Sequence, residues 1–130
     1  MNRPTIHRRR RIEFADTDAS GRAHFTALLR HAEAVEHELL AELGIPLAGA
    51  AGGWPRVRVE CDFRAPLGAG DEVEVTVVPA RVGSGSVEWR FELRRPGGET
   101  AAEGRMVTAR VGADGKAAAI PEEWRKRLGG

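Results

Sequence analysis

The sequence predicts an α+β domain in which an antiparallel sheet packs against one long helix. Apolar residues recur at steps of three and four from Phe25 to Leu43, which is the spacing of one helix face. After this helix, three segments alternate apolar and polar side chains, as half-buried strands do, a fourth has small residues that suggest close packing, and turns containing Gly or Pro separate most of them. Sequential antiparallel strands with one polar face need a cover for the other face, and the helix supplies it.

The first predicted element is a strand over residues 6–14, in which Ile6 and Ile12 share one side. Four consecutive arginines, from Arg8 to Arg11, lie within it. This run could bind phosphate groups, or it could be the solvated part of a strand at an edge of the sheet.

The predicted long helix follows over residues 25–43. Gly44 and Pro46 end it, because Gly is favoured just after a helix and Pro cannot continue one. Residues 47–53 are small and flexible, and they are predicted to form a loop.

The remaining predicted elements are strands over residues 56–64, 72–77, 87–94 and 100–111, and a short helix that opens at residues 120–124. Pro121 suits the first turn of that helix, where no backbone N–H is needed. Cys61 lies in the alternating apolar row of the first of these strands, so we expect a small core residue and not a nucleophile.

Length and composition restrict the class of protein. At 130 residues we expect a single domain over residues 1–130. The net charge of +1 gives no sign of a nucleic-acid-binding surface, and no apolar run reaches the length of a membrane span or signal peptide. The single cysteine excludes an internal disulfide, and no His or Cys cluster has the spacing of a metal site. We therefore expect a cytoplasmic protein without bound metal and without nucleic-acid or membrane partners.

The loop before the long helix could carry chemistry. Asp16 and Asp18 are two residues apart, so in extended chain their side chains point to the same side, and Gly21 allows a tight turn. The first helical turn adds free N–H groups, which can hold a carbonyl oxygen while a carboxylate attacks the carbon or activates water. Both aspartates could equally be turn and capping residues, as is common in short loops.

Several motifs of this chain occur together in one family. Asp16-Thr17-Asp18-Ala19-Ser20-Gly21 is followed by His24-Phe25 and by a helix that ends near Leu43-Gly44-Ile45. Further along are Cys61-Asp62-Phe63-Arg64-Ala65-Pro66-Leu67, Gly70-Asp71-Glu72-Val73 and Ile120-Pro121. In these motifs the chain resembles the 4-hydroxybenzoyl-CoA thioesterase branch of the hotdog-fold superfamily over nearly its whole length. The Asp-x-Asp-x-x-Gly motif is the specific part, and it favours catalytic aspartates over turn residues.

The resemblance implies the hotdog fold, a five-stranded antiparallel sheet wrapped around one long central helix. It implies a homodimer, or a dimer of dimers, with active sites between subunits. It further implies hydrolysis of acyl-CoA or acyl-carrier-protein thioesters without a metal or an organic cofactor. Two alternatives stay open: an acyl-thioester-binding protein of this fold that lacks turnover, and a hotdog dehydratase or hydratase, which the Asp motif disfavours.

The resemblance also implies roles for single residues. Asp18 matches the catalytic carboxylate, and His24 matches the position whose backbone N–H polarises the thioester carbonyl. Family members often carry Tyr-His or Asn-Asn where this chain has His24-Phe25, so the role of the His24 imidazole stays open. Support of the loop and of the oxyanion site is assigned to Asp16, Thr17, Gly21 and Phe25.

Two helical residues, Leu28 and Glu36, are assigned to the substrate pocket. Glu36 is unexpected, because at about 100° per residue it falls near the centre of the apolar stripe. A carboxylate under an apolar sheet is costly unless it is paired, protonated or facing a cavity. Glu36 could therefore pair with a strand arginine, such as Arg58 or Arg90, or face the acyl pocket together with Asp18.

Overall fold

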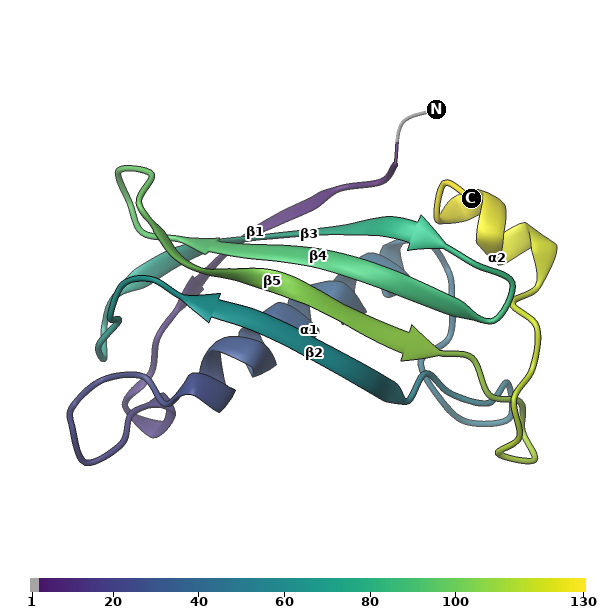
Figure 1. The fold of residues 1–130 in the computed structure, drawn as a ribbon, viewed down its shortest axis with the longest axis horizontal. Coiled ribbons are helices and arrows are strands. Elements are labelled where there is room, and N and C mark those ends of the chain that lie inside the picture. Colours follow the sequence, from purple (N-terminus) through teal and green to yellow (C-terminus); the bar gives the residue numbers. More distant parts are fainter. Residues whose placement is uncertain (1–2) are drawn as a thin grey trace.

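The computed structural model describes residues 3–130 and contains a five-stranded antiparallel sheet with a long helix against one face (Figure 1). The elements are β1 (Ile6–Arg11), the 3₁₀ turn η1 (Phe14–Asp16), α1 (Phe25–Glu42), β2 (Arg56–Phe63), β3 (Glu72–Val82), β4 (Ser86–Arg94), β5 (Thr100–Ala109) and α2 (Glu122–Arg127). The strands lie in the order β1-β3-β4-β5-β2. The predicted α+β architecture with one long helix is therefore confirmed.

The core lies between α1 and the inner face of the sheet. Alternation along β4 puts Trp89 and Leu93 on this face, and the stripe of α1 brings Val35 and Leu39 against it. Trp89 Nε1 donates a hydrogen bond to Thr108 Oγ1 at 2.9 Å, so its buried polar atom is satisfied. The helix packs mainly on β1, β3 and β4.

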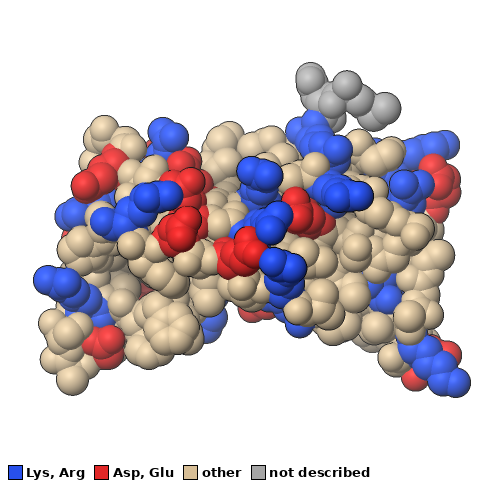
Figure 2. Space-filling view, viewed as in Figure 1, with Lys and Arg blue, Asp and Glu red and all other residues tan. Residues whose placement is uncertain are grey.

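The outer face of the sheet carries interleaved positive and negative side chains (Figure 2). Arg105 of β5 pairs with Glu60 of β2 at 2.6 Å and with Glu88 of β4 at 3.4 Å. Hydrogen bonds from Arg105 and Arg58 lower the pKa of Glu60 to about 2. The polar half of the alternating pattern is thus a set of cross-strand ion pairs.

β1 ends earlier than predicted because the chain turns into η1. The Glu13 N–H donates to Asp16 Oδ2 at 2.8 Å, and the Asp16 N–H donates to the Glu13 carbonyl at 2.9 Å. This reciprocal cap bends the chain away from the sheet edge. It delivers the Asp motif to the N-terminal end of α1.

β2 forms one edge of the sheet, and its apolar row is largely uncovered. Val57, Val59 and Phe63 are 63%, 42% and 49% exposed, and Cys61 among them is only half-buried. The prediction that Cys61 is a small core residue is met only in part: Cys61 packs against the core but stays half-buried, because α1 packs mainly on the other strands. Partial burial still raises the pKa of the Cys61 thiol to about 11, so it stays protonated at neutral pH.

The short helix α2 closes the end of the fold that lies away from η1 (Figure 1). The Arg110 guanidinium lies over the rings of Trp54 and Trp124, at 5.4 and 4.8 Å from their centroids. This stack joins the loop after α1 to α2. Among residues 3–130, no helix is both long and apolar enough to cross a bilayer.

Candidate active site

The Asp motif forms a small turn directly before α1. The Asp18 N–H donates to the Arg22 carbonyl at 3.0 Å, and the Gly21 N–H donates to the Asp18 carbonyl at 2.9 Å. Gly21 has a φ of 80°, in the region that favours glycine, so the expected tight turn is present. Thr17 Oγ1 donates to the Phe14 carbonyl at 2.7 Å and joins the turn to η1.

Asp18 lies at the exposed part of this turn. Its Oδ1 accepts hydrogen bonds from the Ser20 hydroxyl at 2.5 Å and from the Ser20 N–H at 2.9 Å. These bonds, with a smaller contribution from His24, hold the pKa of Asp18 below its ordinary value, so it is ionised at neutral pH. Its Oδ2 accepts no hydrogen bond from residues 3–130. An ionised carboxylate with one free oxygen can attack a carbonyl carbon or take a proton from water.

Asp16 is buried and bonds to three neighbouring segments. Its Oδ2 accepts hydrogen bonds from the Glu13 N–H at 2.8 Å and from His31 Nε2 at 2.9 Å, and its carbonyl accepts one from the His24 N–H at 2.8 Å. Burial acts to raise the pKa of Asp16, but the bonds from Glu13 and His31 lower it overall. The sequence reasoning missed His31 as a partner. Its place one turn before Val35, as a polar residue on the buried stripe of α1, is the signal that could have found it.

The first turn of α1 offers one backbone donor that the fold does not use. The His24 N–H is occupied by the Asp16 carbonyl, and His24 Nδ1 accepts the Thr26 N–H at 3.2 Å as an N-cap. The Phe25 N–H has no hydrogen-bond partner in the described part of the chain. In this arrangement Phe25 carries the free donor, and the expected roles of His24 and Phe25 at the oxyanion site stay predictions.

An apolar cavity of about 340 Å³ opens beside the start of α1. Phe25 and Leu28 line it from the helix, and Phe63 lines it from the end of β2. The rings of Phe25 and Phe63 meet edge to face, with centroids 6.1 Å apart. Arg22 and Arg64 also line it, and Arg64 is paired with Glu103 at 3.0 Å. The cavity therefore combines an apolar lining, arginines at its margin and Phe25, the residue with the free backbone N–H of α1.

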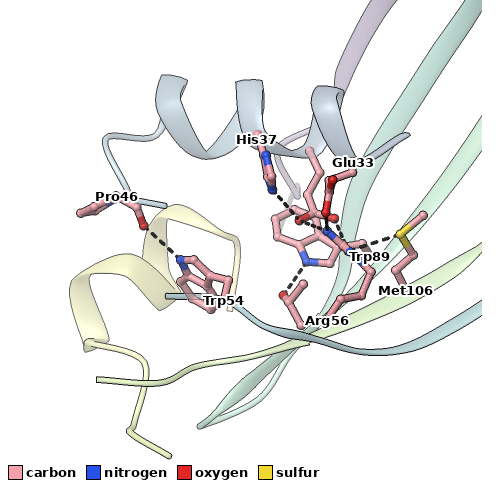
Figure 3. A network of polar contacts seen from close by, with 9 residues as sticks. Glu33, His37, Pro46, Trp54, Arg56, Trp89 and Met106 are labelled. Carbon is pink, nitrogen blue, oxygen red and sulfur yellow. Dashed lines mark hydrogen bonds and ion pairs between the residues drawn. The ribbon is translucent and has the colours of Figure 1, made fainter. Parts of the chain in front are cut away.

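Glu36 does not line this cavity and instead forms a buried ion pair. Arg56, at the start of β2, donates to the two Glu36 oxygens at 2.9 and 3.2 Å and to Glu33 Oε2 at 2.9 Å. Figure 3 shows the Arg56 side chain lying against Glu33 beneath α1. The pocket role expected of Glu36 gains no support from this cavity and stays a prediction. The alternative, an ion pair with a strand arginine, is present, but Arg58 and Arg90 are not the partner because they alternate onto the outer face.

Comparison with known proteins gives the family. The sequence model of the thioesterase superfamily matches residues 20–102. The chain belongs to the thioesterase superfamily. The match begins at Ser20, so Asp16, Thr17 and Asp18 lie just before it, and their roles in this superfamily member stay predictions.

Curated relatives of this thioesterase-superfamily chain include 1,4-dihydroxy-2-naphthoyl-CoA hydrolases. That of Prochlorococcus marinus is 35% identical over 102 residues, which cover 69% of this chain and 65% of the relative. The matched segment thus spans slightly less than two thirds of the length of that relative.

Solved structures share the fold of this superfamily member. A 1,4-dihydroxy-2-naphthoyl-CoA thioesterase from Synechocystis superposes with a TM-score of 0.87 at 20% identity, and 96% of each chain is covered. A 4-hydroxybenzoyl-CoA thioesterase mutant, complexed with 4-hydroxybenzoyl-CoA, gives a TM-score of 0.86 at 19% identity over 95% of this chain and 98% of that one. The predicted hotdog fold is therefore confirmed.

Proposed function

We propose that this chain hydrolyses acyl-CoA thioesters. The observation that carries the proposal is the ionised Asp18 carboxylate, with one free oxygen, on a turn that leads into the helix end where the Phe25 N–H is free. The curated relatives, which are named as CoA thioester hydrolases, support the same bond as the target.

In the proposed reaction Asp18 attacks the thioester carbonyl carbon, or it takes a proton from the water that does so. The Phe25 N–H, at the positive end of the α1 dipole, holds the carbonyl oxygen as it becomes negative. The C–S bond then breaks, and CoA leaves as a thiolate that takes up a proton. When Asp18 attacks directly, the acyl group is left on Asp18 as a mixed anhydride, which water then hydrolyses. In both routes water supplies the hydroxyl group of the acid product. These steps use no metal or organic cofactor.

We assign an aromatic acyl group to the apolar cavity. Phe25 and Phe63 offer ring edges and faces that suit a flat aromatic group, and Leu28 adds an aliphatic wall. The naphthoyl-CoA hydrolases among the relatives support this class. We further propose that Arg22 and Arg64, which line the same cavity, meet the charged part of the thioester.

Turnover of a thioester panel tests both proposals. The panel contains 1,4-dihydroxy-2-naphthoyl-CoA, 4-hydroxybenzoyl-CoA, a straight-chain acyl-CoA, an enoyl-CoA and an acyl-carrier-protein thioester, with thiol release measured by absorbance. We expect hydrolysis, with a higher kcat/KM for the aromatic CoA thioesters than for the straight-chain one. Tight binding without release of thiol from any member would favour the acyl-binding alternative. Hydration of the enoyl-CoA would favour the hydratase.

We propose that two copies of the chain pair through the β2 edge and complete the site. The uncovered apolar row contains Val57, Val59 and Phe63, and Phe63 also lines the cavity. An apolar edge strand in a small sheet is stabilised by pairing with a second copy. A site on this edge would then receive side chains from both copies.

Sedimentation velocity at micromolar protein is expected to give a dimer or a dimer of dimers. Val57→Asp puts a charge into the uncovered row without touching the cavity, so it is expected to increase the monomer fraction and reduce activity. Leu47→Asp is the matched control, because Leu47 is an exposed apolar residue outside the sheet. A folded and fully active monomer of the parent chain would contradict both the pairing and the shared site.

The cytoplasm is the location that we propose. Cys61 is a free thiol, and free thiols persist in a reducing compartment.

A further inference from the structure

A second, polar cavity lies where β1 leaves the sheet for η1, and the proposed hydrolysis does not use it. Its volume is about 420 Å³. Four arginines line it (Arg9, Arg10, Arg11 and Arg30), together with Glu13 and the bonded pair of Asp16 and His31. Three of these arginines come from the run that could either bind phosphate or be a solvated edge strand.

Arg10 is the half-buried anchor of this cavity. It lies opposite Val73 in the β1–β3 register and therefore faces the helix side of the sheet. Its Nε donates to His31 Nδ1 at 2.7 Å, while His31 Nε2 bonds to Asp16 Oδ2 at 2.9 Å. Because arginine can only donate, Nδ1 accepts and Nε2 carries the ring proton that His31 donates to Asp16. The bond to His31, which is itself bonded to Asp16, holds the Arg10 guanidinium in place, and the two terminal nitrogens of Arg10 have no acceptor between Arg3 and Gly130.

The other three arginines are only loosely paired. Arg30 Nη2 lies 3.5 Å from Asp16 Oδ1. Arg9 and Arg11 approach Glu72 at 3.7 and 3.6 Å, which is too long for hydrogen bonds. All three side chains are mostly exposed, so their donors remain available to a ligand.

Arg8 shows what an occupied arginine in the same run is like. It hydrogen-bonds to both Glu38 and Glu42 of α1, which raises its pKa. The run is therefore divided between one arginine that attaches β1 to α1 and three that line this cavity, with Arg10 on the helix side of the β1 edge and Arg9 and Arg11 on its other side.

We propose that this cavity binds a phosphate group, with Arg10 as its fixed anchor and Arg9, Arg11 and Arg30 around it. Guanidinium groups match phosphate oxygens with paired hydrogen bonds, and several of them can share one dianion. The carboxylate of Asp16 is already bonded to Glu13 and His31, so it opposes an anion less than a free carboxylate would. The phosphate is either one of those carried by CoA, a source that rests on the proposed function, or a free phosphate.

Direct binding tests the site without relying on hydrolysis. Isothermal titration of the parent chain uses inorganic phosphate, CoA and dephospho-CoA. The main variant is Arg9→Gln/Arg11→Gln, since both residues are exposed and neither contacts the Asp loop. Its matched control is Arg81→Gln/Arg90→Gln, which removes two exposed strand arginines outside this cavity. We expect phosphate-bearing ligands to bind the main variant about tenfold or more weakly and the control unchanged.

Kinetics then identify the source of the phosphate. If CoA carries it, the main variant raises KM for a CoA thioester about tenfold with kcat unchanged, while an N-acetylcysteamine thioester, which has no phosphate, behaves as with the parent. If the phosphate is free, inorganic phosphate binds in the titration and KM for the CoA thioester stays parental.

Arg10→Gln is a second variant, and its loss of binding counts only if its circular dichroism is parental. Equal affinity of parent and main variant for all three ligands overturns the proposal. A chain that binds phosphate but hydrolyses no thioester overturns only the proposed function.

Discussion

Asp18→Asn is expected to reduce thioester turnover by roughly two orders of magnitude or more, the scale of losing a general base. Asparagine keeps the shape of the side chain and can still accept the Ser20 bonds, but it has neither the charge to attack a carbonyl nor the basicity to activate water. The fold should be unaffected because Asp18 is exposed. Steady-state kinetics with the thioester panel measure turnover, and a thermal melt measures the stability of the fold.

Asp114→Asn is the matched control for this substitution. Asp114 Oδ1 accepts the Lys116 N–H at 2.9 Å, as Asp18 Oδ1 accepts the Ser20 N–H, but it lies in a turn outside the site. Its loss should leave kcat at the parental value.

Because the bonds from Ser20 keep the pKa of Asp18 below its ordinary value, kcat/KM of the parent should not fall through loss of this charge until the pH is below the ordinary carboxyl range. Parental turnover by Asp18→Asn would refute the assignment.

Arg56→Met is expected to destabilise the folded chain by about 3–5 kcal/mol at neutral pH, the usual effect of removing one partner from a buried ion pair. It leaves the Glu36 carboxylate, which is only 2% exposed, without its hydrogen-bond donors. Burial raises the pKa of Glu36 even with Arg56 beside it, so the folded chain binds a proton here more readily than the unfolded chain. The contribution of Glu36 to the free energy of unfolding therefore falls as the pH rises above the ordinary carboxyl pKa. The loss of stability in Arg56→Met should shrink as the pH is lowered towards that pKa, because Glu36 then becomes protonated.

Urea unfolding at two pH values measures this deficit. Arg58→Met is the control on the same strand, because Arg58 is exposed and bonds to the exposed Glu60, and it should change stability by about 1 kcal/mol or less. Arg56→Met/Glu36→Met removes both charges and should regain most of the loss. An unaltered unfolding midpoint in Arg56→Met would contradict the structural role of the pair. Glu36→Gln adds the kinetic test: altered acyl preference in a folded variant would support a place for Glu36 in the substrate pocket.

The helix and the strands could be predicted because each carries a local period that survives into the structure. The loop could be predicted as a site because its two aspartates and Gly21 are close in sequence. The partners of these residues could not be predicted from the sequence. Asp16 meets His31, and His31 meets Arg10, through contacts between a loop, a helix and a strand, and such contacts leave no periodic signal.

Two further differences between prediction and structure also arise from contacts between segments that are distant in the sequence. Alternation shows that β2 has an apolar side, but it does not show what covers that side, so it cannot reveal that Cys61 lies only at the margin of the core. The pattern likewise places Glu36 on the buried stripe without naming its partner. The partner is Arg56, whose place at the beginning of β2 depends on how the strand enters the sheet.

The bonds of Asp16 bear on how a substrate would be held. Its carboxylate and carbonyl tie together Glu13, His24 and His31, so η1, the turn and the start of α1 are ordered by the fold itself. Fixing a residue costs roughly 1–2 kcal/mol of conformational entropy, and here that cost falls on folding rather than on binding. A thioester arriving at Asp18 would meet a loop that has little freedom left to lose, so more of its contact energy would appear as affinity and as correct alignment.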